Sequence, residues 1–293
     1  MPKLNGEAEA IAHGAATIIN AIAIGEGAAF GVNLWTKALV KLTNEPNFIE
    51  GEIISDPKES TVLIEKTVTR VLEHFKMETE FGAKVRTRSN IPIARGLKSS
   101  SAAANAVTLA TVAALGKSIE DLEAVNLGVD ASFEAKVTIT GAFDDACASY
   151  FGGVVVTDNL NRNLIGRSSL PENLSVLFHV PSEKAYTANS NIDKLRGISP
   201  LVRIAYKEAV CGNFWTALSL NGLIYSSALG FDPSIALEAL NAGAVAAGLC
   251  GKGPAVTAVV SDDCLDQVRD AMQAREGKII QALLNHEKAR VVG

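Results

Sequence analysis

The sequence predicts an α+β fold. Strand-like and helix-like segments follow one another without the regular alternation that produces a doubly wound parallel sheet. The chain has 293 residues, of which 48% are hydrophobic, so it can bury a sizeable core as one large or two moderate domains. A polar, Asn-rich segment over residues 158–173 separates two halves that each combine strands with helices, and it is expected to be a connection.

The first half opens with strands. Residues 14–24 and 28–42 have strand character, and Gly25-Glu26-Gly27 between them is a turn signal, so together they predict a hairpin. Residues 48–55 and 83–88 are predicted to be two further strands. Apolar residues recur at helical spacing between these two strands, which predicts a helix. These residues are Ile64, Val68, Val71, Leu72 and Phe75.

An alanine-rich run over 102–115 predicts a central helix, because small side chains let neighbouring elements approach closely. Gly116 can end it. Ser118-Ile119-Glu120-Asp121 fits a capping box with Asp in place of Glu, and the next helix is expected to run towards Glu134. A strand over 154–157 ends the first half.

The second half repeats this mixture of elements. Its expected elements are a strand over 174–180, helices over 199–211, 213–228 and 234–247, a strand over 255–260 and a closing helix over 262–275.

Charge and cysteine content exclude several classes of protein. The net charge is −5 and no dense Lys/Arg cluster offsets it, which argues against a nucleic-acid partner. The cysteines form no CxxC pair, so reduced thiols and a cytoplasmic location are expected. Residues 15–24 are apolar, but Asn20 interrupts them and they lack the basic start of a signal peptide. No stretch of about 20 apolar residues predicts a membrane span.

The stretch that follows strand 83–88 has the pattern of an anion site. A glycine turn and three serines precede the alanine-rich helix, whose first N–H groups lack partners and carry part of the helix dipole. A phosphate can bind there, and serine hydroxyls can cap the helix or offer oxygen to Mg²⁺. The alternative is a serine-capped helix after a turn. The residues are Pro92, Ile93, Ala94, Arg95, Gly96, Leu97, Lys98, Ser99, Ser100, Ser101 and Ala102.

Two adjacent carboxylates, Asp144 and Asp145, lie in small and apolar surroundings within Gly141–Cys147. Phosphoryl transfer needs donors for the phosphates, Mg²⁺ and a carboxylate that accepts the acceptor proton. The alternative is an N-cap and a first-turn acid on a helix over 145–150. Neither a P-loop motif nor a dinucleotide fingerprint occurs. A glycine-rich loop over 248–254 is the third unusual stretch.

The pattern Pro92-x-x-x-Gly96-Leu97-x-Ser99-Ser100-x-Ala102 resembles the phosphate-binding signature of the GHMP kinases, the family of galactokinase, homoserine kinase and mevalonate kinase. The loop over 248–254 resembles their third motif. Thr17–Ile22, Gly96–Ala102 and Gly141–Gly153 resemble the archaeal-type shikimate kinases within that family. The resemblance covers essentially the whole chain.

The resemblance implies a two-domain α+β fold. Residues 1–160 would form the ATP-binding domain, similar to domain 2 of ribosomal protein S5 with its left-handed βαβ crossover. Residues 161–293 would form a ferredoxin-like domain, with the ligands in the cleft between the two. The implied reaction is ATP-dependent phosphorylation of the 3-hydroxyl of shikimate, a step towards chorismate and the aromatic amino acids. Another small-molecule kinase of the family, for homoserine or mevalonate, and a non-catalytic sensor are the alternatives.

The resemblance also implies roles for individual residues. Gly96 to Ser101 would wrap the phosphates of ATP, with Ser100 and Glu134 as Mg²⁺ ligands. Asp144 would be the catalytic base, and Asp145 competes for that role. Taken alone, Glu134 has the pattern of a solvated helix residue.

Two lysines depart from the family pattern. Lys98 stands where many relatives have Gly, and Lys252 lies inside the third loop. Each could approach phosphate or point to solvent. Lys194, Arg196 and Arg203 are candidates for the shikimate carboxylate, although a solvated surface position is the alternative for each.

Overall fold

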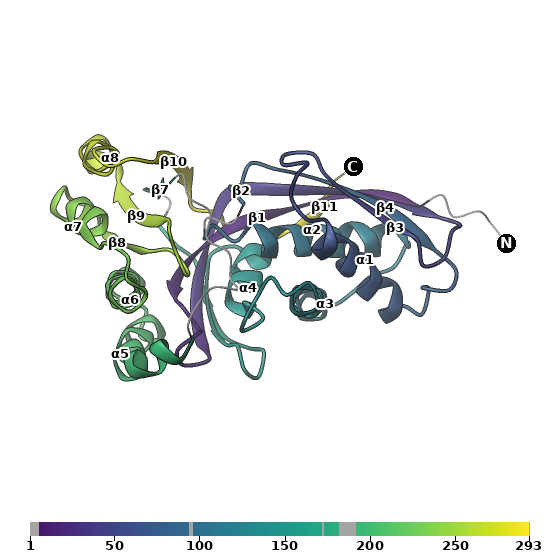
Figure 1. The fold of residues 1–293 in the computed structure, drawn as a ribbon, viewed down its shortest axis with the longest axis horizontal. Coiled ribbons are helices and arrows are strands. Elements are labelled where there is room, and N and C mark those ends of the chain that lie inside the picture. Colours follow the sequence, from purple (N-terminus) through teal and green to yellow (C-terminus); the bar gives the residue numbers. More distant parts are fainter. Residues whose placement is uncertain (1–5, 94–95, 172, 182–191, 293) are drawn as a thin grey trace.

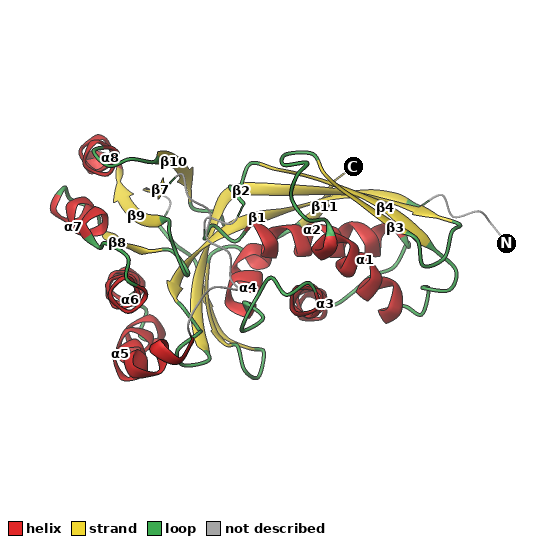
Figure 2. Ribbon diagram, viewed as in Figure 1, coloured by secondary structure: helices red, strands yellow, loops and turns green. Residues whose placement is uncertain are grey.

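Two β-sheets, each covered by its own group of helices, make up the molecule (Figures 1 and 2). The structure, a computed structural model, describes residues 6–93, 96–171, 173–181 and 192–292. Helices α1 to α4 cover the larger sheet, and α5 to α8 lie with the smaller one. The mixed order of elements confirms the predicted α+β class. No helix among the described residues is long and apolar enough to cross a membrane.

The larger sheet is built around the predicted hairpin of β1 and β2. Its strands run in the order β11-β1-β2-β4-β3, and β5 also pairs with β2 and carries β6 at its other edge. All pairings are antiparallel except that between β3 and β4. The strands are β1 (Glu7–Ile19), β2 (Glu26–Thr43), β3 (Ile49–Ile53), β4 (Gly82–Ser89), β5 (Val154–Asp158), β6 (Asn163–Ser168) and β11 (Arg290–Val292).

The predicted central helix lies on β1 and β2 and contacts the other three helices of its group. Its alanines Ala102, Ala106 and Ala110 are fully buried, so the backbone of α2 comes close to its neighbours, as the alanine-rich run predicts. The four helices are α1 (Val62–His74), α2 (Ser99–Ala114), α3 (Asp121–Glu134) and α4 (Phe143–Phe151).

The smaller sheet is fully antiparallel, with strand order β10-β7-β9-β8. Numbered along the chain from β7, this is the order 4-1-3-2, and it confirms the expected ferredoxin-like arrangement. The strands are β7 (Leu174–Val180), β8 (Ala246–Leu249), β9 (Val256–Ser261) and β10 (Lys278–Leu283). The helices are α5 (Ser199–Val210), α6 (Phe214–Leu229), α7 (Ser234–Asn241) and α8 (Leu265–Gln273).

Several predicted elements are wrong. The segment 158–173, expected to be a connection, contains β6, an edge strand whose largely exposed residues carry no alternating apolar signal. The helix expected over 234–247 ends at Asn241, because its small residues also fit the buried strand β8. Strands β10 and β11 follow the helix that was expected to close the fold. All three differences arise because strand pairing depends on a distant partner.

Two strands beyond residue 160 do not belong to the second sheet, although the sequence predicts a domain boundary between residues 160 and 161. Strand β6 and strand β11 both belong to the larger sheet. The two sheets also share one hydrophobic cluster, in which Phe30 of β2 and Phe178 of β7 are both fully buried. The chain therefore crosses back to the first sheet after completing the second.

Helix α6 joins the smaller sheet to the turn after β1. A methyl group placed on Gly222 would lie 2.3 Å from the Cα of Gly248, so the helix touches β8 backbone to backbone. The Tyr225 hydroxyl donates to the Asn20 carbonyl at 2.9 Å, and Asn221 Oδ1 accepts from the Asn20 N–H at 3.1 Å. These contacts fix the turn after β1 relative to the second sheet.

Candidate active site

One cavity of about 390 Å³ brings together five segments that are far apart in the sequence. They are the end of β1 with its turn, the loop between β3 and α1, the start of α2, the end of α3 with its connection to the start of α4, and the loop between β8 and β9. The serine loop, the aspartate pair and the third glycine loop therefore share one site. Its lining residues include Thr17, Asn20, Ile93, Gly96, Lys98, Ser99, Ser100, Ser101, Asp144, Asp145, Gly251, Lys252 and Gly253.

The serine loop enters α2 through a left-handed residue. Lys98 has φ 62° and ψ 32° and precedes the first helical residue, Ser99. No side chain caps this helix end, so the interpretation as a serine-capped helix is wrong. The three serines lie in the first turn and line the cavity together with N–H groups that have no helical partner. This helix end is suited to bind an anion.

Other residues of the expected phosphate loop shape it from outside the cavity. Leu97 and Ala102 are buried in the core and do not line the cavity, nor does Pro92. Ala94 and Arg95 lie outside the described residues.

Gly96 lets the serine loop touch the third glycine loop. Its φ is +89°, and a methyl group there would lie 2.6 Å from the carbonyl oxygen of Cys250. The Cys250 thiol donates to the Gly96 carbonyl at 3.1 Å. Glycine is required at this position by both its backbone angle and the close contact.

The two aspartates lie in the first turn of α4, which begins at Phe143. Ala142 precedes the helix in the left-handed region and no side chain caps it, so the expected N-cap is wrong, whereas the expected first-turn acid is confirmed. Asp144 is 4% exposed and Asp145 is 6% exposed. The helix N-terminus favours their negative charge, but burial opposes it.

Asp144 is held from the β2–β5 side of the cavity. The Asn159 side-chain amide donates to Asp144 Oδ1 at 2.8 Å, and the Thr157 hydroxyl donates to Asn159 Oδ1 at 2.7 Å. A methyl group on Gly27 would lie 2.7 Å from Asp144 Oδ2, so a larger residue there would displace the carboxylate. Burial, together with the charge of Asp145, raises the pKa of Asp144 to about 7.

One oxygen of Asp145 forms an ion pair with Lys98 inside the cavity. Lys98 Nζ lies 2.9 Å from Asp145 Oδ2, and both side chains are largely buried. Burial lowers the pKa of Lys98, but Asp145, Cys250 and Asp144 outweigh this and raise it above its usual value. Asp145 Oδ1 is buried and has no partner among the described residues. Lys98 therefore does not point to solvent.

Lys252 also lines the cavity, but unlike Lys98 it has no acidic partner among the described residues. Its side chain is half-buried at the rim of the β8–β9 loop, and no described residue forms an ion pair or hydrogen bond with it. Burial and the nearby Lys98 ammonium together lower the pKa of Lys252 to about 8, although the charge of Asp145 acts in the opposite direction.

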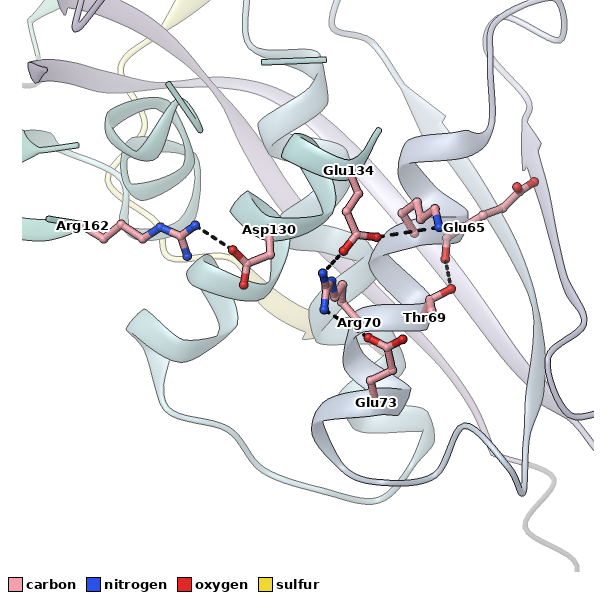
Figure 3. A network of polar contacts seen from close by, with 8 residues as sticks. Glu65, Thr69, Arg70, Glu73, Asp130, Glu134 and Arg162 are labelled. Atoms are coloured by element: carbon pink, nitrogen blue, oxygen red, sulfur yellow. Dashed lines mark hydrogen bonds and ion pairs between the residues drawn. The ribbon is translucent and has the colours of Figure 1, made fainter. Parts of the chain in front are cut away.

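Glu134 lies outside this lining. Figure 3 shows its carboxylate turned towards Arg70, with which it forms an ion pair, and Lys66 Nζ is 3.7 Å away. The structure therefore does not bring Glu134 together with Ser100 as a joint metal site. Among the described residues, no three His, Cys, Asp or Glu side chains form a metal cluster.

Of the basic residues expected to bind the carboxylate of the substrate, Arg196 and Arg203 do not line the cavity. Arg203 pairs with Glu26 at 2.9 Å, Arg196 is exposed, and the side chain of Lys194 lies outside the described part of the chain.

Sequence reasoning missed several polar residues of the site, among them Glu59, Ser132 and Lys136 in the cavity lining and Asn159 beside Asp144. Asn159 lies in the segment expected to be a connection, so nothing local indicated it. Thr17 is 2% exposed, lines the cavity, and its hydroxyl has no described partner. Its place in the family-like Thr17–Ile22 stretch was the one available signal.

Solved structures share this architecture. Homoserine kinase from Cytophaga hutchinsonii superposes with a TM-score of 0.74 at 18% identity, covering 100% of this chain and 99% of that one. Mevalonate kinase from Methanococcus jannaschii superposes with a TM-score of 0.74 at 16% identity, covering 94% and 98%. At these identities the likeness shows the fold.

Sequence relatives are much closer. The chain is 46% identical to a shikimate kinase of Methanosarcina mazei, covering 97% of this chain and 96% of the relative. It is 42% identical to one of Methanothermobacter thermautotrophicus, covering 95% and 96%. Residues 63–153 match the family model of the GHMP kinases N terminal domain. The shared motifs, the site and these full-length matches together show that the chain belongs to the GHMP kinase family, within the group of archaeal shikimate kinases.

Proposed function

We propose that this protein transfers the γ-phosphoryl group of ATP to the 3-hydroxyl of shikimate, a step of the shikimate pathway. The observation that carries the proposal is the single cavity in which an anion-binding helix end faces a buried carboxylate pair. The shikimate kinases that match it over almost their full length support the choice of acceptor.

The phosphates of ATP bind at the start of α2 in this proposal. The free N–H groups and the helix dipole stabilise the negative charge there, and Ser99 to Ser101 add hydroxyl donors. The contact between Gly96 and Cys250 holds the loop in place before the nucleotide arrives. Positioning and charge neutralisation are the main sources of rate in phosphoryl transfer.

The oxygen-rich lining fits Mg²⁺. This ion is held by one or two carboxylates together with substrate phosphates, so a cluster of three acids is not needed. Ser100 would hold it, and Asp145 Oδ1 is a buried carboxylate oxygen without a partner in the same cavity. Glu134 would first have to leave Arg70 and Lys66. When bound, Mg²⁺ neutralises charge on the transferred phosphate.

Asp144 is our proposed base for the acceptor hydroxyl. Its pKa of about 7 lies near the operating pH, where a general base is most effective. The unpartnered oxygen of Asp145 supports the competing assignment. Whichever aspartate is the base, Lys98 stabilises the negative charge of the two carboxylates, because its ammonium forms an ion pair with Asp145.

ADP release with Mg·ATP and a panel of acceptors tests the function. Shikimate, quinate, homoserine, mevalonate and galactose are compared at equal concentrations. Release with shikimate alone is the expected result. Release with another acceptor would keep the fold and the reaction type but refute the proposed substrate.

The two aspartates are separated by their asparagine variants. Asp144→Asn is expected to bind ATP normally and to lower kcat by about 10²- to 10⁴-fold, the usual contribution of general acid–base catalysis. If Asp144→Asn kept a near-normal kcat while Asp145→Asn lost it, the base would be Asp145.

A further inference from the structure

The floor of the cavity is acidic, which creates a problem for an acceptor that is itself an anion. Asp144 and Asp145 are adjacent and buried, and the reacting hydroxyl must come close to them. Shikimate carries its carboxylate on the same small ring as that hydroxyl. Like charges at short range in a partly dry site repel strongly. Productive binding therefore requires a positive charge beside the aspartates that is not already neutralised.

Lys98 does not supply this charge. Its ammonium lies 2.9 Å from Asp145 Oδ2, so the two groups neutralise each other. Arg203 is paired with Glu26, and Lys136, which also lines the cavity, is exposed, so water and salt screen its charge. The start of α2 offers N–H groups and a dipole, but these serve the phosphates in the proposed function.

Lys252 has the required properties. It is half-buried at the cavity and is close enough to both Lys98 and Asp145 for their charges to affect its pKa. No ion pair or hydrogen bond joins it to any residue that the structure describes. It comes from the β8–β9 loop, which contacts the loop before α2 and lines the same cavity.

The backbone on both sides of Lys252 is fixed in place. The Asn20 side-chain amide donates to the Gly251 carbonyl at 2.9 Å, and the Gly253 N–H donates to the Cys250 carbonyl at 2.9 Å. The Cys250 N–H donates to the Ala255 carbonyl at 2.8 Å. The ammonium therefore extends from a rigid loop, which lowers the entropy that binding would cost.

We propose that Lys252 binds the carboxylate of the acceptor and orients its ring so that the hydroxyl faces the aspartate pair. The inference rests on the proposed function and names the residue that recognises the substrate's charge. Lysine acts here as a point charge, which suits a carboxylate that must be released after transfer. Asp144 then faces the reacting hydroxyl while Lys252 holds the carboxylate.

The test crosses two variants with two substrates. Lys252→Met keeps the apolar stem and removes the charge, and Lys252→Arg restores a charge. Each is assayed for ADP release with shikimate and with its uncharged methyl ester. Lys207→Met, an exposed lysine on α5, is the control for loss of a surface charge. Calorimetric titration of both compounds in the absence of nucleotide measures the same preference without turnover.

The wild-type protein is expected to prefer shikimate over the ester. Lys252→Met is expected to lower kcat/KM for shikimate on the order of a hundredfold, to leave the KM for ATP nearly unchanged and to remove the preference for the acid. Lys252→Arg is expected to recover part of the preference for the acid, and Lys207→Met is expected to behave as wild type.

Two results would overturn the inference while leaving the kinase assignment intact. One is a Lys252→Met variant that keeps the wild-type preference for acid over ester. The other is a rise in the KM for ATP with equal losses for both acceptors, which would place Lys252 on the phosphates. A wild-type protein inactive with shikimate would refute the proposed function itself, and this inference with it.

Discussion

Replacing Asp144 by Asn should make the protein more stable, and the gain should depend on pH. The native pKa of Asp144 is about 7, whereas the unperturbed value is 3.8. Between these values the native state keeps a proton that the unfolded chain has released, so native stability falls as pH rises through this window. Each pH unit contributes about 1.4 kcal/mol, so the whole window is worth at most about 4 kcal/mol.

Asparagine removes this penalty because it is neutral at every pH and can still accept from the Asn159 amide. The variant should match wild type near pH 4 and exceed it increasingly up to about pH 7, above which the difference stays constant. At full size the gain corresponds to a rise in Tm of roughly 10 °C.

Thermal unfolding of both proteins across this pH range measures the effect. Asp266→Asn is the control, because that carboxylate is 87% exposed and its loss should leave the pH dependence unchanged. Parallel curves for wild type and Asp144→Asn would refute the reasoning. The same variant should lose most of its turnover, so the site would gain stability at the expense of catalysis.

Three further predictions concern packing and charge. Gly222→Ala places a methyl group 2.3 Å from the Cα of Gly248 and should cost about 3 kcal/mol or more in urea unfolding, whereas Gly166→Ala, with nothing within 4 Å, should be nearly silent. Lys98→Met leaves Asp145 buried without its cation, so we expect a loss of about 3 kcal/mol in the free energy of unfolding. The loss of the positive charge should also shift the kcat–pH profile to higher pH. An unchanged profile would mean that Lys98 does not lower the pKa of the catalytic carboxylate. Glu134→Gln weakens the partly exposed ion pairs with Lys66 and Arg70 and should lower the free energy of unfolding by less than about 1 kcal/mol. The Mg²⁺ concentration that half-saturates the enzyme should stay unchanged. A marked rise in that concentration would show that Glu134 leaves Arg70 to bind the metal.

Features encoded by local sequence were predictable. The hairpin of β1 and β2, the amphipathic helix α1 and the buried alanine-rich helix α2 follow from periodicity and side-chain size. The serine loop was also visible, because the start of a helix after a glycine turn has unpaired N–H groups in any fold. Strand β6 was not, since its two large apolar residues, Leu164 and Ile165, are adjacent and do not alternate with polar ones.

The partners of the site residues depend on contacts between distant segments. Asn159 reaches Asp144 because β5 pairs with β2, and Lys98 reaches Asp145 because α2 and α4 begin at the same cavity. Glu134 pairs with Arg70 because α3 packs on α1. The sequence by itself determined which segments carry phosphate-binding and acidic groups, since these depend on residue type and local backbone. Only the tertiary structure decided which charges neutralise one another, because that depends on distances across the fold.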